Sequence, residues 1–466
     1  MIDSEKHFGI SEEKLFDLVE RLDVRGPRYT SYPTVPVWKS EFPAYYFEEA
    51  LARVATDRKP IAVYLHFPFC SKRCLFCGCN SHITHDNERI THYISALKKE
   101  IEKSSVILNG KVNCQWLHLG GGTPTHTPAK LLAELLDFLL VRIPPVTDAE
   151  LSVEVDPRVT TDEHLKLLVD RGFRRISIGL QDLNPEVQLA VMREYSFEKM
   201  NEFVAKCRSF GFTSTNIDLI YGLPHQTRTT WCHTLEQVVT LRPDRLACFG
   251  YAHLPEKTRH QRAIDETALP DPRQRLGMLL DANAFFVSKG YDAIGFDHFA
   301  LPDDKLSKAL RNGKMWRNFM GYTEIRGLEM VGFGASSISE FNELFVQNIT
   351  LPEDYNAQIE MGNWAIAKGY SHSDDDLMRK ILINDLMCNL LIRVPPEASL
   401  MPKDLIDPLK ETIESLWPFE SEGLITASAN GEYAVTDIGR LFLRNLAMPF
   451  DQYLPKQSTV NFSRTI

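Results

Sequence analysis

The sequence contains no apolar run long enough to cross a membrane, which takes about 18 uninterrupted residues. The longest apolar stretch, residues 131–141, is broken by Glu134 and Asp137 and has the pattern of an amphipathic helix. The first residues, MIDSEKHFG, lack the positive start and apolar run of a secretory signal. We therefore expect a cytoplasmic protein that does not bind membranes.

An excess of positive charge is also lacking. Lys and Arg number 52 against 62 Asp and Glu, which gives a net charge of −10. Such a chain has no broad electrostatic attraction to nucleic acid or anionic lipid, so neither is expected as a partner. An anionic substrate would need basic residues of its own at the binding site.

The remaining composition is that of a globular protein. The chain has 466 residues, of which 44% are hydrophobic and 24% charged, and this length suits several domains or one large barrel with additions. Disulfides are not expected in the cytoplasm, so the nine cysteines should be thiols or metal ligands. We expect a monomer.

Short β-branched or apolar runs alternate with helical patterns from residue 60 to about residue 300. The predicted strands are Ile61–Phe67, Cys114–Leu119, Leu151–Val155, Arg175–Leu180, Ser214–Tyr221, Arg245–Tyr251 and Ala293–Phe296. The predicted helices between them are Ile90–Ile101, Pro128–Val141, Asp162–Arg171, Phe197–Phe210, Thr229–Leu241 and Pro272–Lys289. Repeated strand–helix units predict an α/β fold with a parallel sheet, closed fully or partly into a barrel.

Five successive predicted strands end in cysteine, glycine or polar residues. They lead into Cys70, into the glycine run at residues 120–122, into Glu154, into Gln181 and past Asp218. Because chemistry in β/α barrels lies at the carboxyl ends of the strands, these residues predict one shared site.

The flanking regions have other patterns. Residues 1–55 read as an irregular arm after a helix at Ser11–Leu22, and residues 56–350 as the catalytic barrel. In residues 351–466, helices at Leu377–Ile392 and Pro408–Leu416 precede a hairpin with its turn at residues 429–432 and a last helix capped by Asp437. This is a mostly helical, winged-helix-like pattern. For this domain we favour a role in packing or in covering the substrate over DNA binding.

Four cysteines fall within ten residues: Cys70, Cys74, Cys77 and Cys79. Chance clustering is improbable at this density. A structural zinc site usually joins two separate cysteine pairs, and the other five cysteines are scattered. An iron–sulfur cluster is the third interpretation, and three thiolates on one loop would leave one iron of a four-iron cluster open to a small molecule.

The C-x3-C-x2-C spacing resembles the motif of the radical S-adenosylmethionine (SAM) superfamily. Cys70, Cys74 and Cys77 match it residue by residue, and Phe76 has the usual aromatic place before the third cysteine. The resemblance implies that these thiolates hold a [4Fe-4S] cluster whose open iron binds SAM, which one electron then cleaves to a 5′-deoxyadenosyl radical. The run Gly120–Thr123 is similar to the superfamily segment that receives the methionyl amino group.

Longer motifs resemble the family of oxygen-independent coproporphyrinogen III dehydrogenases. They are GPRYTSYPT (26–34), YLHFPFCSKRCLFCGCN (64–80), LHLGGGTPT (117–125), SVEVDPR (152–158), GLQDLNPEVQ (179–188), TSTNIDLIYGLP (213–224), YAHLP (251–255), DHFALPDD (297–304), NFMGYT (318–323) and the terminal FSR-x-I. The resemblance implies a radical-SAM partial (β/α)6-type barrel. It also implies oxidative decarboxylation of two propionates of coproporphyrinogen III to vinyl groups, which gives protoporphyrinogen IX.

The family further implies two SAM molecules beside one cluster. The positions matching contacts to the first SAM are Tyr64, Gly121, Glu154 and Ile338. Those matching contacts to the second are Phe76, Gly122, Thr123, Gln181, Arg193, Asp218 and Ala252. An Arg can bind a methionyl carboxylate through two parallel hydrogen bonds, but ion pairing elsewhere or simple core packing is the alternative role for these residues.

Tyr64, His66 and Cys79 are expected near the reacting centre, with core packing as the alternative for each. Arg28 is the candidate for binding a substrate carboxylate, or else a tether for the arm. An electron donor and an electron acceptor are implied but not identified by the sequence.

One motif departs from the family. Met320 stands where the family usually has glutamine, and residues 324–329 depart from its polar run. A methionine cannot donate a hydrogen bond, whereas glutamine can, so this segment does not fix the identity of the substrate. The alternatives to the decarboxylation are a related tetrapyrrole methyltransferase or ring-opening enzyme, and a haem-binding chaperone.

Overall fold

The computed structural model describes residues 7–428, 431–454 and 462–465 and contains one large mixed sheet with a parallel centre. Its strand order is β1-β17-β16-β15-β14-β2-β5-β6-β7-β8-β9-β11-β10. The parallel strands that follow one another in the chain are β2 (Ile61–Phe67), β5 (Cys114–Gly121), β6 (Pro145–Val155), β7 (Arg175–Gln181), β8 (Ser214–Tyr221) and β9 (Arg245–Gly250). The predicted strands and their parallel order are thus confirmed for these six.

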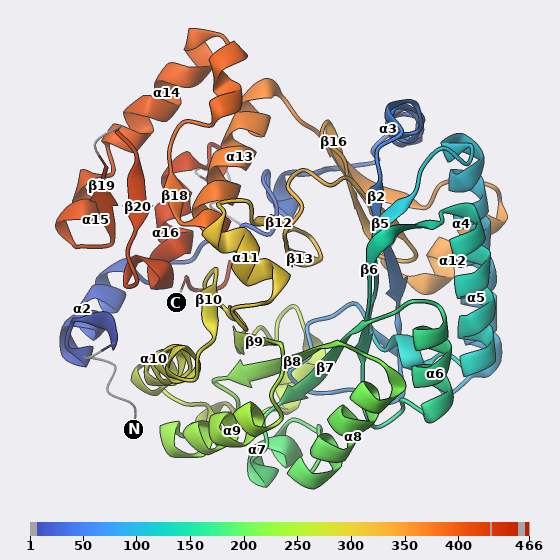
Figure 1. Cartoon of the computed structure of the whole chain (residues 1–466), viewed down its shortest axis with the longest axis horizontal. Helices are drawn as coiled ribbons and strands as arrows, with labels where there is room; N and C mark the ends of the chain where they lie inside the picture. Colours follow the sequence, from blue (N-terminus) through green and yellow to red (C-terminus); the bar gives the residue numbers. More distant parts are fainter. Residues whose placement is uncertain (1–6, 429–430, 455–461, 466) are drawn as a thin grey trace.

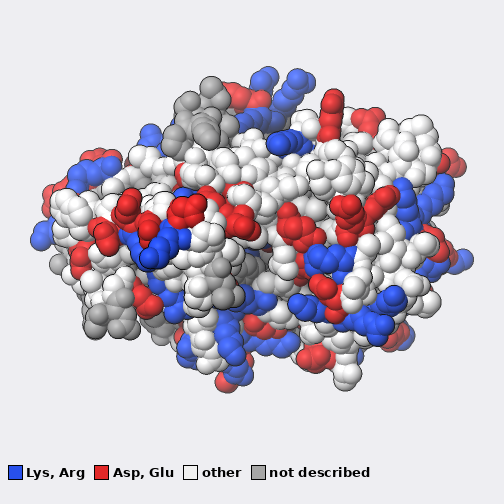
Figure 2. Space-filling view, turned by 90° about the horizontal axis from the view of Figure 1, so that it is seen from above, with Lys and Arg blue, Asp and Glu red and all other residues white. Residues whose placement is uncertain are grey.

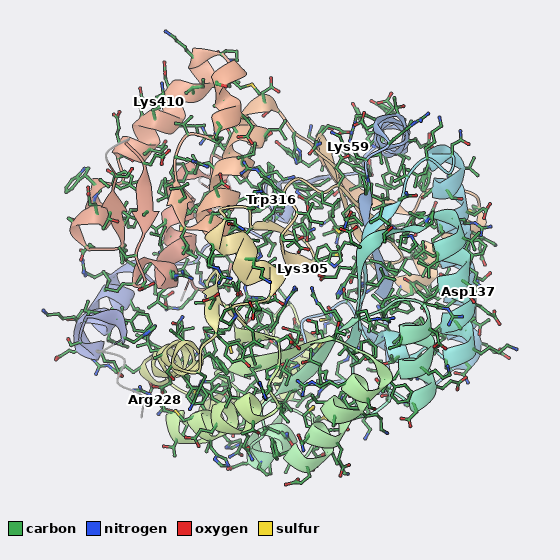
Figure 3. The ribbon with its side chains drawn as sticks, in the orientation of Figure 1. Lys59, Asp137, Arg228, Lys305, Trp316 and Lys410 are labelled. Atoms are coloured by element: carbon green, nitrogen blue, oxygen red, sulfur yellow. The ribbon has the colours of Figure 1, made fainter. Side chains whose placement is uncertain are left out.

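Helices follow these strands and cover the outer side of the curved sheet, as Figure 1 shows. They are α4 (Asn87–Leu108), α5 (Ala129–Arg142), α6 (Asp162–Asp170), α7 (Pro185–Ala190), α8 (Phe197–Phe210), α9 (Arg228–Thr240) and α10 (Pro272–Ser288). In Figure 3 Asp137 is labelled on α5, outside the sheet, whereas Lys305 lies inside its curve, near Glu150 of β6 (3.7 Å).

Additional strands extend both sides of the parallel centre. On one side β14 (Met330–Phe333) runs parallel to β2, and the antiparallel strands β15 (Ile338–Glu340), β16 (Leu344–Asn348), β17 (Ile366–Ser371) and β1 (Lys39–Ser40) follow. On the other side β11 (His298–Ala300) and β10 (Asp292–Ile294) form an antiparallel pair beside β9. The sequence predicted Ala293–Phe296 as another strand of the parallel series, and this is wrong. Three residues join β10 to β11, which is too short for a parallel crossover.

The alternation of side chains along the strands separates an apolar layer from a polar interior. Val63, Leu117, Val153, Ile176 and Ile217 are fully buried against the outer helices. The alternate positions point to the inner side and carry Tyr64 and His66 on β2, His118 on β5, Glu154 on β6 and Asp218 on β8. The period of two therefore brings the polar residues to one concave surface.

Among the described residues, three smaller sheets and further helices accompany the large sheet. The sheets are β3 (Phe69–Cys70) with β4 (His82–Ile83), β12 (Trp316–Asn318) with β13 (Gly321–Thr323), and β18 (Leu391–Ile392) with β20 (Tyr433–Val435) and β19 (Ile425–Ala427). The other α-helices are α2 (Glu12–Leu22), α3 (Ala44–Asp57), α11 (Lys305–Arg311), α12 (Pro352–Glu360), α13 (Asp374–Asn389), α14 (Lys403–Glu414), α15 (Trp417–Ser421) and α16 (Leu443–Ala447). Short 3-10 helices include η3 (Arg259–Ala263) and η6 (Gly439–Phe442).

Several predictions for the flanking regions need correction. The region taken as an irregular arm contains α3, whose buried face packs on the main core. Strands β19 and β20 form the predicted hairpin, but its turn includes residues 429–430, which lie outside the described residues. Asp437 does not cap the last helical segment, because the Thr436 hydroxyl accepts the hydrogen bond from the Gly439 N–H (3.0 Å).

The division into residues 1–55, 56–350 and 351–466 stays a prediction. β1 and β17 come from the first and last of these parts, and both belong to the large sheet. Lys, Arg, Asp and Glu side chains are intermingled on the face seen in Figure 2. Among the described residues, the helices are all too short or too polar to span a membrane.

Candidate active site

A cavity of about 150 Å³ lies where the carboxyl ends of the parallel strands meet the cysteine loop. Most of the residues predicted from the sequence line it: Cys70, Cys74, Phe76, Cys77, Cys79, Gly121, Gly122, Thr123, Glu154, Gln181, Arg193 and Asp218. These residues come from the strands β5 to β8 or their ends, from the cysteine loop after β2 and, for Arg193, from the segment after α7, so the fold brings them together as the strand-end pattern predicts.

The cysteine loop is held by backbone and side-chain hydrogen bonds. The Cys77 N–H donates to the Cys74 carbonyl (3.2 Å), which forms a tight turn within the motif. From η3, His260 Nε2 lies 2.8 Å from the Cys77 carbonyl oxygen, and Gln261 Nε2 donates to the Phe76 carbonyl (3.2 Å). The loop therefore keeps its shape through contacts with a segment about 180 residues away in the chain.

The thiols of the loop differ in their surroundings. Burial raises the pKa of Cys70 to about 11, although the Thr123 hydroxyl lies 3.4 Å from its sulfur. A hydrogen bond from Cys79 is the main cause that lowers the pKa of Cys77 to about 6. Arg158 and Arg193 place guanidinium nitrogens 3.6 and 3.7 Å from the Cys74 sulfur. Both guanidinium groups thus stand within hydrogen-bonding reach of this sulfur.

Glycine is required in the run at residues 120–122 because neighbouring residues lie very close to its backbone. A Cβ atom at Gly121, where φ is +111°, would lie 2.6 Å from the His66 ring. A Cβ atom at Gly122 would lie 2.8 Å from the Phe69 carbonyl and 3.1 Å from the Cys70 sulfur. These positions admit no side chain, so the backbone itself forms this wall of the cavity.

Glu154 is fixed from two sides on β6. Its Oε1 lies 3.2 Å from His118 Nε2, and its Oε2 accepts a hydrogen bond from the Gly121 N–H (3.1 Å). Burial opposes ionisation of Glu154, but the bonds from His118 and Gly121 outweigh it and lower the pKa of the carboxyl. Glu154 is therefore a carboxylate at neutral pH, suited to accept bonds from an ammonium or hydroxyl group.

Gln181 and Arg193 lie side by side at the end of β7. Arg193 forms an ion pair with Asp156 (2.8 Å) and donates to the Gly179 carbonyl. Gln181 has φ of +74°, uncommon for a residue with a side chain, and its buried Oε1 has no hydrogen-bond partner among the described residues. A strained residue with an unsatisfied acceptor is typical of a ligand-binding position.

Asp218 is the carboxyl group that β8 contributes to the cavity. Burial raises its pKa to about 6, with the Glu154 charge as the second cause. Asn216 Nδ2 (2.7 Å) and the Ser177 hydroxyl (3.3 Å) donate to its two oxygens and oppose this shift.

Tyr64 and His66 lie beneath the glycine run. The Tyr64 hydroxyl is 3.1 Å from His66 Nδ1, and His66 Nε2 is 3.0 Å from the Asn80 carbonyl oxygen. Burial lowers the pKa of His66 to about 4, so its ring is neutral at pH 7. In that form the hydroxyl donates to Nδ1 and the Nε2–H donates to Asn80.

Five predicted site residues do not line this cavity: Tyr64 and His66, described above, and Ile338, Ala252 and Arg28. Ile338 is on β15, and its backbone stands against Gly332, the β14 residue paired with Tyr64. Ala252 and Arg28 line a second cavity beyond the ends of β8 and β9. The two cavities adjoin, because Gln261 donates both to the Ala252 carbonyl (3.2 Å) and to Phe76.

The departing segment lies on the inner side of the sheet. Met320 packs with Phe319 and Tyr64 in a small apolar cluster around Trp116. Arg326, within residues 324–329, binds Asp385 (3.2 Å) and Glu397 (3.0 Å). This segment is thus joined to α13, and its methionine fills apolar space where a polar side chain was expected.

Sequence reasoning missed several residues that hold the site together. Arg158 pairs with Asp156 (2.7 Å) and contacts the Cys74 sulfur, and the DPR end of the SVEVDPR motif was its available signal. His118 supports Glu154, and its place two residues before the glycine run put it on the same strand face. No sequence pattern indicates His260, whose contact with Cys77 depends on the tertiary fold.

The residues present fit a thiolate-held cluster with a polar ligand beside it. Three thiols converge on a cavity whose glycine wall approaches Cys70, and the buried Gln181 oxygen lacks a donor. Within the described ranges, no three His, Cys, Asp or Glu side chains are spaced to hold a single metal ion. Thiols that each bind a different iron of a cluster do not need that spacing.

Comparison with known proteins places the chain in a family. Residues 64–238 match the family model of the radical SAM superfamily. Oxygen-independent coproporphyrinogen III oxidases from Escherichia coli and Pseudomonas aeruginosa are 39% and 38% identical to the chain, over 96% and 97% of it and 98% of each relative. The structure of the Escherichia coli coproporphyrinogen III oxidase HemN, described as a radical SAM enzyme, superposes with a TM-score of 0.87 at 38% identity, covering 94% of this chain and 98% of that one.

The α/β fold with its parallel centre and the cysteine loop at the strand ends define a radical SAM enzyme. Membership in that superfamily implies a [4Fe-4S] cluster and SAM. Within it, the chain belongs to the family of oxygen-independent coproporphyrinogen III oxidases.

Proposed function

We propose that the protein converts two propionate side chains of coproporphyrinogen III to vinyl groups without oxygen, which gives protoporphyrinogen IX. The observation that carries the proposal is the cavity in which the cysteine motif meets Glu154, Gln181, Arg193 and Asp218, in a chain that matches its relatives over nearly their whole length. Each propionate loses one hydrogen atom, one electron and CO2.

Cys70, Cys74 and Cys77 would hold one [4Fe-4S] cluster, and the remaining cavity residues would bind two SAM molecules. Glu154 and Gly121, with Tyr64 and Ile338 behind them, would contact the first. The second would contact Phe76, Gly122, Thr123, Gln181, Arg193, Asp218 and Ala252. The supporting features are the ionised Glu154, the unsatisfied Gln181 oxygen and the donors of Arg193 that face the Cys74 sulfur.

When bound and reduced by one electron, the cluster with SAM supplies a radical able to remove hydrogen from an unactivated carbon. Tyr64, His66 and Cys79 are proposed to lie near that reaction. The neutral His66 keeps the Tyr64 hydroxyl oriented through their 3.1 Å contact. The thiol of Cys79, which lowers the pKa of Cys77, would stabilise the negative charge that Cys77 carries as a cluster ligand.

The architecture is proposed to be a partial (β/α)6-type barrel with a winged-helix-like C-terminal domain. Strands β2 and β5–β9 supply the six parallel strands, and the β19–β20 hairpin follows α14 and α15 as a wing would. We propose the boundaries 1–55, 56–350 and 351–466 for arm, barrel and C-terminal domain. We further propose a cytoplasmic monomer that receives electrons from a reduced donor and passes the substrate electrons to a separate acceptor.

The test is anaerobic reconstitution with iron and sulfide, followed by incubation with SAM, a reductant and coproporphyrinogen III. We expect two CO2 and two new vinyl groups for each tetrapyrrole converted, with 5′-deoxyadenosine formed. Cys74→Ala should abolish 5′-deoxyadenosine formation, while Cys232→Ala, at a cysteine outside the motif on α9, should not.

Other products would replace this function with an alternative. Release of S-adenosylhomocysteine without CO2 would indicate a methyltransferase. Haem binding by reduced protein that does not cleave SAM would indicate a chaperone. Zinc in place of iron and sulfide in protein purified without oxygen would overturn the cluster assignment itself.

A further inference from the structure

The second cavity, of about 250 Å³, lies between the ends of β8 and β9, the N-terminal arm and the last described residues. Five arginines line it: Arg25, Arg28, Arg275, Arg444 and Arg464. Among the described lining residues Asp297 is the one carboxylate. In a chain of net charge −10, such a local excess of positive charge is a departure from the rest of the molecule.

Three of these arginines are occupied in holding the chain together. Arg25 donates to the Phe462 carbonyl (3.2 Å), and Arg464 pairs with Asp23 (2.9 Å). Arg444 donates to the backbone carbonyls of the arm and the C-terminal segment, including that of Pro27 (2.9 Å). Their positive charges remain, but their side chains are held by the arm and the C-terminal segment.

Arg28 and Arg275 have donors to spare. Arg28 is exposed and makes no hydrogen bond or ion pair with any residue that the structure describes. Arg275, on the first turns of α10, donates from Nη2 to the Tyr251 carbonyl (3.0 Å), while its buried Nε has no partner within the described chain. The Nη1 group of Arg275 makes no hydrogen bond with the described residues, so its donors can bind an incoming anion.

The carboxylate of Asp297 does not occupy these donors. Its Oδ1 lies 2.6 Å from His298 Nδ1. Burial opposes ionisation of Asp297, but His298, with smaller contributions from Arg317 and Arg28, lowers its pKa. Phe249, Tyr251, Leu254 and Phe296 form apolar walls around the cationic end. The volume is below the range typical for a whole organic ligand, so the cavity suits one side arm of a larger molecule.

We propose that this cavity binds one carboxylate arm of the substrate, with Arg275 and Arg28 as its two cationic contacts. The inference rests on the proposed function and deepens it. Arg28 is the residue predicted from the sequence, and Arg275 is the new assignment. A guanidinium presents two parallel N–H donors that match the two oxygens of a carboxylate. Gln261 binds both Ala252, which lines this cavity, and Phe76, which lines the cluster cavity, so the two cavities are neighbours.

The test measures equilibrium binding of coproporphyrin III, the stable oxidised tetracarboxylate, and of its uncharged tetramethyl ester. We expect Arg275→Gln and Arg28→Gln each to weaken binding of the acid by about 10- to 100-fold, the usual effect of losing a charge-assisted contact. Binding of the ester should change less than twofold. Arg275→Lys keeps the charge and should recover a large part of the affinity.

Arg273→Gln is the matched control, because Arg273 lies two residues away on α10 with its guanidinium 4.1 Å from the Phe16 ring, outside the cavity. It should bind the acid as the unaltered protein does. The proposal is overturned if Arg275→Gln binds the acid with unchanged affinity, or loses acid and ester equally. This measurement needs no turnover, so a failure to release CO2 would count against the proposed function and not against the carboxylate site.

Discussion

At the scale of single residues, the polar inner surface of the sheet is stabilised by pairs across neighbouring strands. His118 contacts both Ser152 (2.8 Å) and Glu154, and Asn216 donates to Ser177 (2.8 Å) as well as to Asp218. Buried polar groups are tolerable when hydrogen-bonded. The site can therefore keep its carboxyl groups in place before any ligand binds.

Ionisation of Asp218 makes the free energy of unfolding depend on pH. An exposed Asp has a pKa near 3.9, and in the folded protein the pKa of Asp218 is about 6. The folded state therefore favours the protonated form, and the stability from this group is present below pH ~4 and lost as pH rises through 6. Asp218→Asn stays neutral, and its amide can accept from Asn216 and donate to Ser177.

We predict that Asp218→Asn and the unaltered protein have similar stability near pH 4. At pH 7.5 the variant should be more stable by about 1–3 kcal/mol, a range reduced for partial solvent screening. Chemical denaturation of protein without SAM at several pH values measures the difference. Asp303→Asn, at an exposed position, is the control and should show no such trend. A difference that stays constant from pH 4 to 8 would contradict the prediction.

Much of the site could be predicted at this scale because the cysteine spacing, the glycine run and the strand-end polar residues are local patterns. Phe76, Gln181 and Asp218 line the expected cavity for that reason. Arg158 and His260 could not be ranked above other Arg and His residues. Their importance comes from contacts with Cys74 and Cys77 that only the tertiary structure creates.

At the scale of elements, the cysteine loop depends on η3. The His260 ring and the Gln261 amide bind successive carbonyls of the loop, at Cys77 and Phe76. Gln261 is buried and also accepts the Leu254 N–H (2.6 Å), which fixes η3 to the segment after β9. The loop that would hold a cluster is therefore positioned by η3.

We predict that His260→Ala loses its cluster faster than the unaltered protein while keeping its fold, because one loop carbonyl no longer has a donor. Iron release to a chelator under anaerobic conditions measures the rate, and we expect an increase of about 10-fold, the lower end for loss of an outer contact to a metal site. His233→Ala replaces an exposed histidine on α9 and should leave the rate unchanged. Equal rates for the two variants would show that η3 does not support the loop.

The elements themselves followed from the sequence where one pattern dominated. The bounds of β2, β8 and α8 agree with the predicted ranges, because each joins a clear periodicity to a clear stop. α3 was missed because the proline-rich segment before it dominated the interpretation of the arm. β10 was misassigned because an apolar run does not reveal whether its partner is parallel or antiparallel.

At the scale of the whole molecule, the two ends of the chain meet. Tyr29 and Tyr32 belong to the same apolar core as α13, α14 and α16, and Tyr29 donates to Asp451 (3.2 Å). Thr465 donates its N–H to the Val24 carbonyl (2.8 Å), and an isolated β-bridge joins Arg25 to Arg464. Figure 1 shows the blue N-terminal segment running beside the red C-terminal helices. Sequence alone could not predict this junction, because it pairs residues more than 400 positions apart.

Arg444 is the central contact of this junction. It is buried, and its guanidinium donates to the carbonyls of Gly26, Pro27, Ser463 and Arg464. A single planar group with five donors can satisfy four carbonyls at once. Glutamine in its place would leave several of them buried and unpaired, each at a cost of about 1–3 kcal/mol before relaxation.

We therefore predict that Arg444→Gln lowers the free energy of unfolding by about 2–4 kcal/mol and exposes the arm to trypsin after Arg25 and Arg28. Mass spectrometry of the early fragments and denaturant titration measure the two effects. Arg440→Gln is the matched control, because Arg440 lies one helical turn away and donates to the Ala293 carbonyl (2.7 Å), which is not in the arm. It should lose stability without early cleavage in residues 25–28. If both variants keep the arm as resistant as the unaltered protein, the arm is held by its tyrosines, and Arg444 serves the second cavity through its charge alone.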